Sequence, residues 1–445
     1  MTQDMTVGSP LRLIVMFTIP LLIGNIFQQL YNIADTVIVG RTIGVQALAA
    51  VGATGPLCFL VLGFFFGFTG GVTVITAQRF GAKDHRGVRR SIATATILCT
   101  AVSLIATVAS VIFTRPMLRL MNTPEDIFDG ASGYLSAIFI GIGATVFYNL
   151  ISGIIRALGD SRTPLYFLII ASVLNIVLDF IFILWFDMGV AGAAWATVGS
   201  QFAAGFWCYR YALRHFRELH LRRSDWRFDW MFAWEHLRIA LPMAFQFSIT
   251  AIGVIVMQAV LNRFGSTTIA AFTAASKVDQ IAVQPGFSIG IAVATFAAQN
   301  YGAKLYTRVR HGVNACMKLS TVFAVLIGIA VIMLCPQFTA LFLGEGQSEI
   351  VHLVRIYMIT NGGFYVLLGF LFIYRNALQG MGYAFVPMMA GVSELFVRSF
   401  GAPLLGAWFG YAGVCLSNPA AWIGALIPLS WSYLRLIRRL TGRYF

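Results

Sequence analysis

Residues 20–40 read PLLIGNIFQQLYNIADTVIVG, and this stretch determines how the whole chain is interpreted. It lies inside an apolar run long enough to cross a bilayer, yet it contains two asparagines, two glutamines and an aspartate. On a helix with 3.6 residues per turn, the polar side chains fall within about a 120° arc. They are Asn25, Gln28, Gln29, Asn32, Asp35 and Thr36. The stretch therefore predicts a membrane helix with one polar face.

Asp35 is the most informative residue of this stripe. An ionised carboxylate at bilayer depth costs several kcal/mol, so it normally faces a water-filled cavity or a partner and marks the path of an ion or a substrate. The alternative places Asp35 near the outer end of its helix, as a boundary residue in contact with water.

The composition predicts an all-α polytopic membrane protein. Of its 445 residues, 58% are hydrophobic and only 11% are charged, and the mean hydropathy is +0.80. A soluble globular protein does not need that much apolar surface. Runs of 18 or more mostly apolar residues give about twelve spans. These lie near 12–38, 46–78, 90–113, 130–155, 163–186, 190–212, 236–261, 268–298, 312–335, 350–378, 384–407 and 412–434.

The net charge of +14 does not indicate a nucleic-acid partner, because the basic residues gather in alternate loops. Since positive charge stays on the cytoplasmic side, both termini are expected inside, with the protein in the cytoplasmic (inner) membrane. The basic run at 210–228 is most simply a topogenic loop, and contact with anionic lipid is the alternative. The basic groups are 79–90, 156–162, 210–238, 304–318, Arg375 and 435–443.

An internal repeat relates the two halves of the chain with a shift of about 221 residues. AQRFGAK at 77–83 meets AQNYGAK at 298–304, and Pro164 meets Pro387 a little further along. Two parallel six-helix repeats are related by an axis along the membrane normal. We expect two pseudo-symmetric lobes around a central cavity, an arrangement suited to alternating access. The expected divisions are 1–212 for the N-lobe, 213–235 for a cytoplasmic loop and 236–445 for the C-lobe.

The two halves differ in their intramembrane acids. The position matching Asp35 holds Val256 or Met257, whereas the Asn25 position keeps a polar residue, Gln246. The fifth span carries Asn175 and Asp179, four residues apart on one helix face. Two such acids can hold and release a proton, or bind a small hard cation together with amide and hydroxyl oxygens. We therefore expect an ion site in the N-lobe, unless Asp179 is only an end marker at the headgroups.

The second half has polar residues of its own inside its spans. Lys277 and Asp279 lie in the eighth span and are either structural or in contact with substrate. Glu394 and Arg398 stand in the favourable i,i+4 order, which predicts a structural ion pair. The six cysteines are scattered singly and lack metal-ligand spacing, so no metal site is indicated. No nucleophile constellation or phosphate-binding loop is present, which argues against an enzyme and against a cofactor.

Several segments of the chain together resemble the multidrug and toxic compound extrusion (MATE) family of secondary transporters. The resemblance is to the bacterial branch named for a DNA-damage-inducible member. The segments cover essentially the whole chain and keep the two-lobe spacing. They are IPLLIGNIFQQLYNIADTVIVGRTIG, AQRFGAKD, RALGDSRTP, NIVLDFIF, GVAGAAWATVGSQ and AAQNYGAK. The resemblance implies twelve helices in two lobes and export of amphiphilic, often cationic, compounds in exchange for H⁺ or Na⁺.

The resemblance also implies an N-lobe cation site. Its residues are Tyr31, Asp35, Asn175, Asp179 and Thr197. Relatives that couple to sodium through the C-lobe use acids on the seventh and tenth helices, and neither helix has one here. This favours H⁺ as the coupling ion, although Na⁺ could bind the same N-lobe residues.

We expect a monomeric, proton-coupled exporter in contact with membrane lipids, with small amphiphilic or cationic molecules as its substrates. Candidate cavity-lining residues are Gln28, Asn32, Gln246, Lys277 and Asp279. One alternative is a flippase for lipid-linked precursors from the same superfamily, which would need a cavity rich in basic residues. Another alternative is a channel or receptor that couples transport to no ion.

Overall fold

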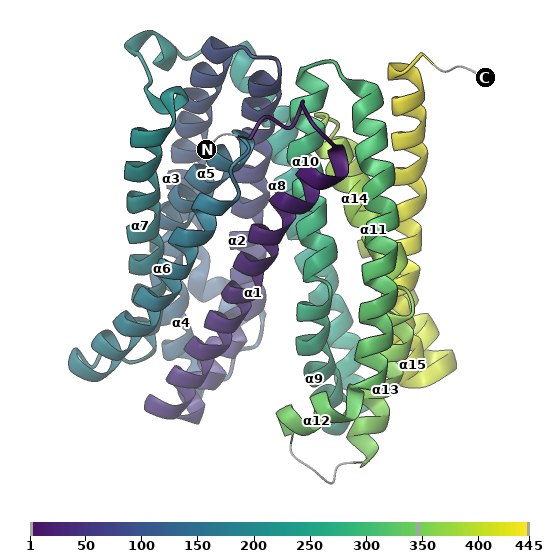
Figure 1. The fold of residues 1–445 in the computed structure, drawn as a ribbon. Helices are drawn as coiled ribbons and strands as arrows, with labels where there is room; N and C mark the ends of the chain where they lie inside the picture. Colours follow the sequence, from purple (N-terminus) through teal and green to yellow (C-terminus); the bar gives the residue numbers. More distant parts are fainter. Residues whose placement is uncertain (1–2, 344–347, 443–445) are drawn as a thin grey trace. The chain divides into compact units, whose positions relative to one another are not determined.

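A computed structural model describes residues 3–343 and 348–442 (Figure 1). These residues form helices joined by short turns, with no β-strand among them. In chain order the helices are α1 (Pro10–Thr42), α2 (Val45–Gly81), α3 (His85–Leu120), α4 (Glu125–Ile140), α5 (Ile142–Ala157), α6 (Arg162–Phe180), the π-helix η1 (Ile181–Trp185), α7 (Gly189–His215), the 3₁₀ turns η2 (Arg217–Leu219) and η3 (Arg223–Trp226), α8 (Trp230–Leu261), the 3₁₀ turn η4 (Asn262–Phe264), α9 (Ser266–Ala282), α10 (Gln284–Gly302), α11 (Tyr306–Met333), α12 (Cys335–Leu343), α13 (Ser348–Gly362), α14 (Tyr365–Gly380) and α15 (Phe385–Leu440).

The helices agree with the predicted twelve-span architecture. Seven are long and apolar enough to cross a membrane, and three bent pairs bring the number to ten. α15 supplies one more span, because Gly410 has a non-helical backbone (φ 59°) and divides it into two helices. α7, with 27 residues, is also longer than the about 20 residues that a span needs. The predicted all-α polytopic fold is confirmed.

Three spans that the sequence predicts as continuous are bent pairs of helices. The bends are 45° between α4 and α5, 40° between α9 and α10, and 46° between α13 and α14. At the first bend, a Cβ on Gly141 would lie 2.1 Å from Cγ2 of Val198, so only glycine lets α7 approach here. At the second, Pro285 stands in the first turn of α10, where its missing N–H costs no helical hydrogen bond.

The chain divides into two compact units, and it passes from one to the other inside α1 and inside α8. The first unit holds Ile23–Ser248 with the few residues before Met5. The second holds Met5–Leu22 and the chain from Ile249 onward. The lobe limits predicted at residues 212 and 236 stay a prediction.

In the first unit, α2 lies directly against the first half of α8. A Cβ on Gly67 would lie 2.4 Å from the carbonyl oxygen of Met243, and one on Gly71 would lie 2.4 Å from Cα of Ala240. Real Cβ atoms do not approach backbone atoms so closely, so glycine is required at both positions. The spacing of four residues puts both glycines on one face of α2, which explains the close helix–helix contact.

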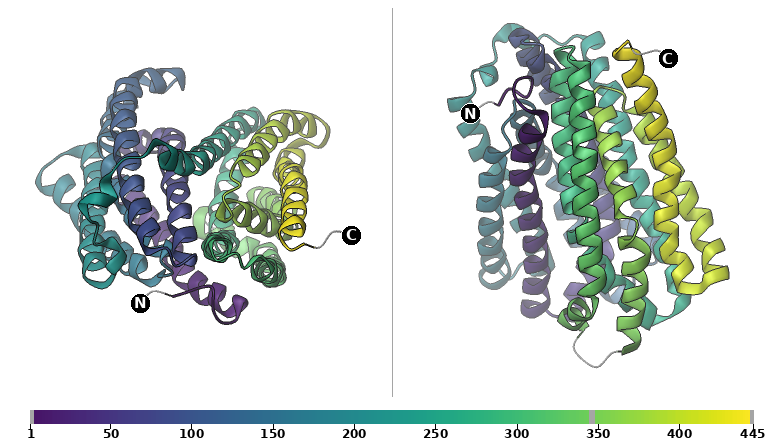
Figure 2. Two further views of the ribbon diagram at one scale, coloured as in Figure 1. Left: turned by 90° about the horizontal axis from the view of Figure 1, so that it is seen from above. Right: turned by 45° about the vertical axis from the view of Figure 1, so that its right-hand side comes forward.

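In the second unit, α10, α11, α14 and α15 pack against one another (Figure 2). The segment before α1 is fixed to this unit at Met5, which is fully buried. The Met5 N–H donates to Oε1 of Gln299 (2.9 Å), and the Met5 carbonyl accepts from Asn300 Nδ2 (3.1 Å) and Arg308 Nη2 (3.2 Å). Gln299 and Asn300 belong to the repeated AQNYGAK motif, which therefore anchors the start of the chain.

Both copies of the repeated motif end their helices in the same way. Lys83 after α2 and Lys304 after α10 have left-handed backbones, with φ of 58° and 60°. The Lys83 N–H donates to the Phe80 carbonyl (2.9 Å), and the Lys304 N–H donates to the Tyr301 carbonyl (3.0 Å). The repeat found in the sequence is therefore also a repeat of local structure.

Candidate functional site

The polar face of α1 lies well inside the helix. α1 continues from Pro10 to Thr42, so Asp35 is followed by about two further helical turns. Asp35 is buried, whereas Gln28 and Asn32 are exposed and Tyr31 is half-buried. The structure thus disfavours the view of Asp35 as a boundary residue at a helix end. Gln28 and Asn32 lie on the same helix but outside the protein core.

Two other helices of the first unit bring polar side chains to Asp35. Asn175 and Asp179 on α6 are almost fully buried, with exposed fractions of 1% and 0%. The Asn175 amide donates from Nδ2 to the Thr197 hydroxyl on α7 (3.3 Å). The carboxyl groups of Asp35 and Asp179 lie close enough to interact with each other. The five residues that the sequence assigns to the N-lobe site therefore lie together, since Tyr31 interacts with both acids.

Four carboxylate and amide oxygens of these residues lack hydrogen-bond partners in the described structure. Among the described residues, nothing forms a hydrogen bond with either carboxylate oxygen of Asp179. The same holds for Oδ1 of Asp35 and for Oδ1 of Asn175. Buried polar atoms are nearly always hydrogen-bonded, and two adjacent carboxylates repel each other when both are ionised. A proton or a small cation would satisfy these atoms, which is the chemistry that the arrangement permits.

Two further residues of the cluster were not predicted from the sequence. Gln201 lies one helical turn after Thr197 on α7, interacts with Tyr31, and has a buried Oε1 atom without a hydrogen-bond partner in the described structure. Tyr134 on α4 interacts electrostatically with Asp35 and Asp179. The i,i+4 spacing of Thr197 and Gln201 in an apolar helix is the signal that could have indicated Gln201.

The helix that carries Asp179 changes geometry directly after it. α6 ends at Phe180, and the next five residues, Ile181–Trp185, form a π-helix. π-helical turns are rare and often occur at functional sites, because they shift the register of the side chains that follow. The acid therefore stands at a local irregularity of its span.

Comparison with known proteins identifies the family. The MatE family model matches residues 20–181 and 242–404, one segment in each half of the chain. The probable multidrug resistance protein YpnP of Bacillus subtilis (strain 168) is 30% identical over 418 residues, covering 93% of this chain and 92% of YpnP. The chain belongs to the MatE family. A second relative from the same organism, the probable multidrug resistance protein YoeA, is 28% identical and covers 98% of this chain and 96% of its own.

The fold of this MatE protein also matches solved structures. A crystal structure of MATE in complex with MaL6 superposes with a TM-score of 0.91 at 23% identity, covering 99% of both chains. The family match and the apolar spans together identify the protein as a multi-pass membrane transporter. Among the described residues, no group of three His, Cys, Asp or Glu side chains could hold a metal ion.

The remaining candidate residues of this MatE protein have separate surroundings. Gln246 on α8 is buried in the first unit and has an interaction partner. In the second unit, Lys277 is exposed, whereas Asp279 is half-buried and accepts a hydrogen bond from the Tyr365 hydroxyl (2.6 Å). Asp279 is thus held by a neighbouring side chain, and Lys277 points away from the core.

Glu394 lies between two arginines in the second unit. Its Oε2 is 3.6 Å from Nη2 of Arg398, at the predicted i,i+4 spacing, and its Oε1 pairs with Arg375. All three side chains are buried. The sequence interpretation placed Arg375 among the basic loop residues, and this was wrong. Arg375 lies inside α14, where Glu394 compensates its charge.

Proposed function

We propose that this transporter exports amphiphilic, often cationic, organic compounds across the cytoplasmic membrane in exchange for protons, by alternating access. Relatives over nearly the full chain length are named probable multidrug resistance proteins, which supports this class of substrate. The expected orientation has both termini in the cytoplasm, as the distribution of basic residues indicates.

The buried carboxylates Asp35 and Asp179 carry the proposal. Two ionised carboxylates in an apolar unit repel each other and are poorly solvated, so the pair gains a strong tendency to take up a proton. Proton uptake removes the repulsion and lets α1 and α6 approach. Proton release has the opposite effect, so protonation is coupled to the packing of these two helices. This packing change is the step that we connect with substrate release.

The same oxygens also suit a sodium ion, because carboxylate, amide and hydroxyl oxygens are the ligands of small hard cations. Asp35, Asp179, Asn175 and Thr197 would then hold it. Transport driven by an imposed pH gradient, compared with an imposed sodium gradient, separates the two coupling ions.

The first test replaces each acid by its neutral amide. Asp35→Asn and Asp179→Asn should each abolish drug resistance in a sensitised host at unchanged expression, because the amides cannot bind and release a proton. Asp126→Asn is the matched control, since Asp126 is exposed in the first turn of α4. Full resistance in both single variants would contradict the mechanism.

Reconstituted vesicles separate the exporter from its two alternatives. Uphill efflux of a fluorescent organic cation under a pH gradient requires a coupled carrier, whereas a channel gives only downhill flux. A flippase for lipid-linked precursors would instead move a labelled pyrophosphate lipid between leaflets. We expect the first result and neither of the others.

A further inference from the structure

A groove in the first unit lies apart from the carboxylate cluster. The end of α2 and the start of α3 form one wall, and the segment before α8 with the first turns of α8 forms the other. The volume of the groove is about 640 Å³. Its lining residues are mostly charged. The charged ones are Arg79, Asp84, Arg86, Arg90, Asp225, Arg227, Asp229 and Glu235.

Most of these charges are already paired, Asp225 with Arg89 beside the groove and the others within it. The ion pairs are Arg79–Glu235 (3.3 Å), Arg79–Asp84 (3.7 Å), Arg89–Asp225 (3.3 Å) and Arg90–Asp229 (2.5 Å). The hydrogen bond from Arg90 lowers the pKa of Asp229, so this carboxylate stays ionised and keeps Arg90 engaged. Arg86 and Arg227 differ from the rest, because neither side chain forms an ion pair or a hydrogen bond within the described part of the chain.

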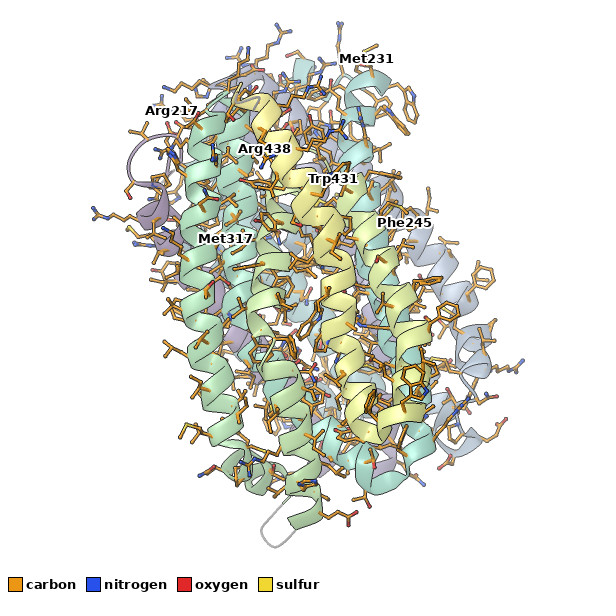
Figure 3. The ribbon with its side chains drawn as sticks, turned by 90° about the vertical axis from the view of Figure 1, so that its right-hand side faces the viewer. Arg217, Met231, Phe245, Met317, Trp431 and Arg438 are labelled. Carbon is orange, nitrogen blue, oxygen red and sulfur yellow. The ribbon has the colours of Figure 1, made fainter. Side chains whose placement is uncertain are left out.

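Exposed aromatic side chains lie directly beside the groove. Trp226, Phe228, Trp230 and Trp234 have exposed fractions between 44% and 65%, and Met231 reaches 77%. Figure 3 shows Met231 near the upper end of the ribbon, at the same end as Arg217. Aromatic rings gather at the level of the lipid headgroups, where one part of the ring is apolar and another is wet. They therefore place the groove at the depth of the lipid phosphates.

We propose that this groove binds the phosphate of an acidic phospholipid, with Arg86 and Arg227 as the two guanidinium groups that contact it. Guanidinium groups match the geometry of phosphate oxygens and keep their charge at this depth. The lipid's glycerol and acyl chains would lie along the exposed aromatic side chains. Since the other charges are paired, the two free arginines favour an anionic headgroup over a zwitterionic one.

The bound lipid would join two segments that are far apart in the sequence. Arg86 begins α3, and Arg227 lies in the segment that leads into α8. A phosphate between them would add a contact between the start of α3 and the segment that leads into α8. The Arg89–Asp225 and Arg90–Asp229 pairs already join these two segments. The site is independent of the coupling ion and of the exported substrate.

The test compares two double variants of the full-length protein. Arg86→Ala with Arg227→Ala removes the proposed contacts, and Arg217→Ala with Arg223→Ala removes two exposed arginines that do not line the groove. Each delipidated protein is incubated with phosphatidylglycerol or phosphatidylcholine in detergent, and retained lipid is counted by native mass spectrometry. Thermal unfolding is followed in parallel.

We expect wild type and the control to retain phosphatidylglycerol and to gain thermal stability from it, whereas the groove variant does neither. Equal retention by both double variants would overturn the proposal. Equal stabilisation of wild type by glycerol 3-phosphate would also overturn it, because the site would then take a soluble phosphate rather than a lipid. The groove variant and wild type should unfold at the same temperature before lipid is added.

Discussion

Gln201 is one of the two uncharged residues of the carboxylate cluster that the sequence did not predict. Its contact with Tyr31 and its unpartnered buried oxygen suggest that it positions Tyr31 beside the acids. Gln201→Leu keeps the size and removes the amide, and we expect the efflux rate to fall by up to about tenfold, because a hydrogen bond contributes about 0.5–1.5 kcal/mol. The pH dependence of efflux should shift as well. Gln46→Leu, at an exposed position on α2, is the control, and an unchanged rate and pH profile for Gln201→Leu would contradict this role.

Glu394 is expected to matter for stability. Glu394→Gln leaves Arg375 and Arg398 as buried charges without a carboxylate, and breaking such a pair costs about 3 kcal/mol or more. The variant should therefore unfold at a clearly lower temperature in detergent. Asp129→Asn, which breaks the exposed pair with Arg115 (3.2 Å), should change the stability by less than about 1 kcal/mol. Equal effects of the two substitutions would show that Glu394 is not the compensating charge.

Polar residues in apolar spans identify part of the candidate site from sequence alone. Asp35, Asn175 and Asp179 interrupt otherwise apolar helices, and the structure brings all three together. Gln201 is signalled only by its i,i+4 spacing from Thr197, and Tyr134 could not be identified in this way, because a tyrosine is common in a membrane helix. Their importance depends on which helices are neighbours.

Arg375 shows that its place in the sequence does not reveal whether a side chain is buried. It stands five residues before Gly380, the last residue of α14, so it looks like part of a loop. The helix runs past it, and Glu394 on α15 lies within ion-pairing distance. Only the packing of α14 on α15 reveals that this arginine is buried.

At the scale of elements, the contact between α2 and α8 makes a direct prediction. Gly67→Ala would bring a Cβ to 2.4 Å from the Met243 carbonyl oxygen, so the two helices must separate. Overpacking of this kind costs about 1–3 kcal/mol, and we expect a lower unfolding temperature. Gly52→Ala on the same helix meets no atom within 4 Å and should be tolerated. If both variants unfold at the same temperature, the close approach of α2 and α8 is not required.

The positions of the spans follow from hydropathy, but their bends do not. The sequence predicts one span at 130–155, whereas the structure has α4 and α5 bent by 45° at Gly141. An apolar run looks the same whether it is straight or bent, and the close approach of Val198 to Gly141 depends on which helices are neighbours. The π-helix after Asp179 cannot be predicted from hydropathy either, because it shifts the register of the following side chains by only one residue.

At the scale of the whole molecule, two structurally repeated halves differ in their buried charges. The first unit holds two acids, and three of their four carboxylate oxygens lack hydrogen-bond partners among the described residues. The second unit holds Glu394 between two arginines. The sequence repeat predicted two halves with the same helical architecture. The absence of an acid at the position matching Asp35 predicted an ion site in the first half only. Under the proposed mechanism, only the acids of the first unit bind and release the coupling proton.

Proton movement during transport distinguishes proton coupling at Asp35 and Asp179 from sodium coupling. Wild-type protein in vesicles containing a pH-sensitive dye should move protons against the direction of a fluorescent organic cation when a cation gradient is imposed. Asp35→Asn with Asp179→Asn should abolish the proton signal, and Asp126→Asn should leave it unchanged. Organic-cation transport driven by a sodium gradient alone, with no proton signal in wild type, would contradict proton coupling at Asp35 and Asp179.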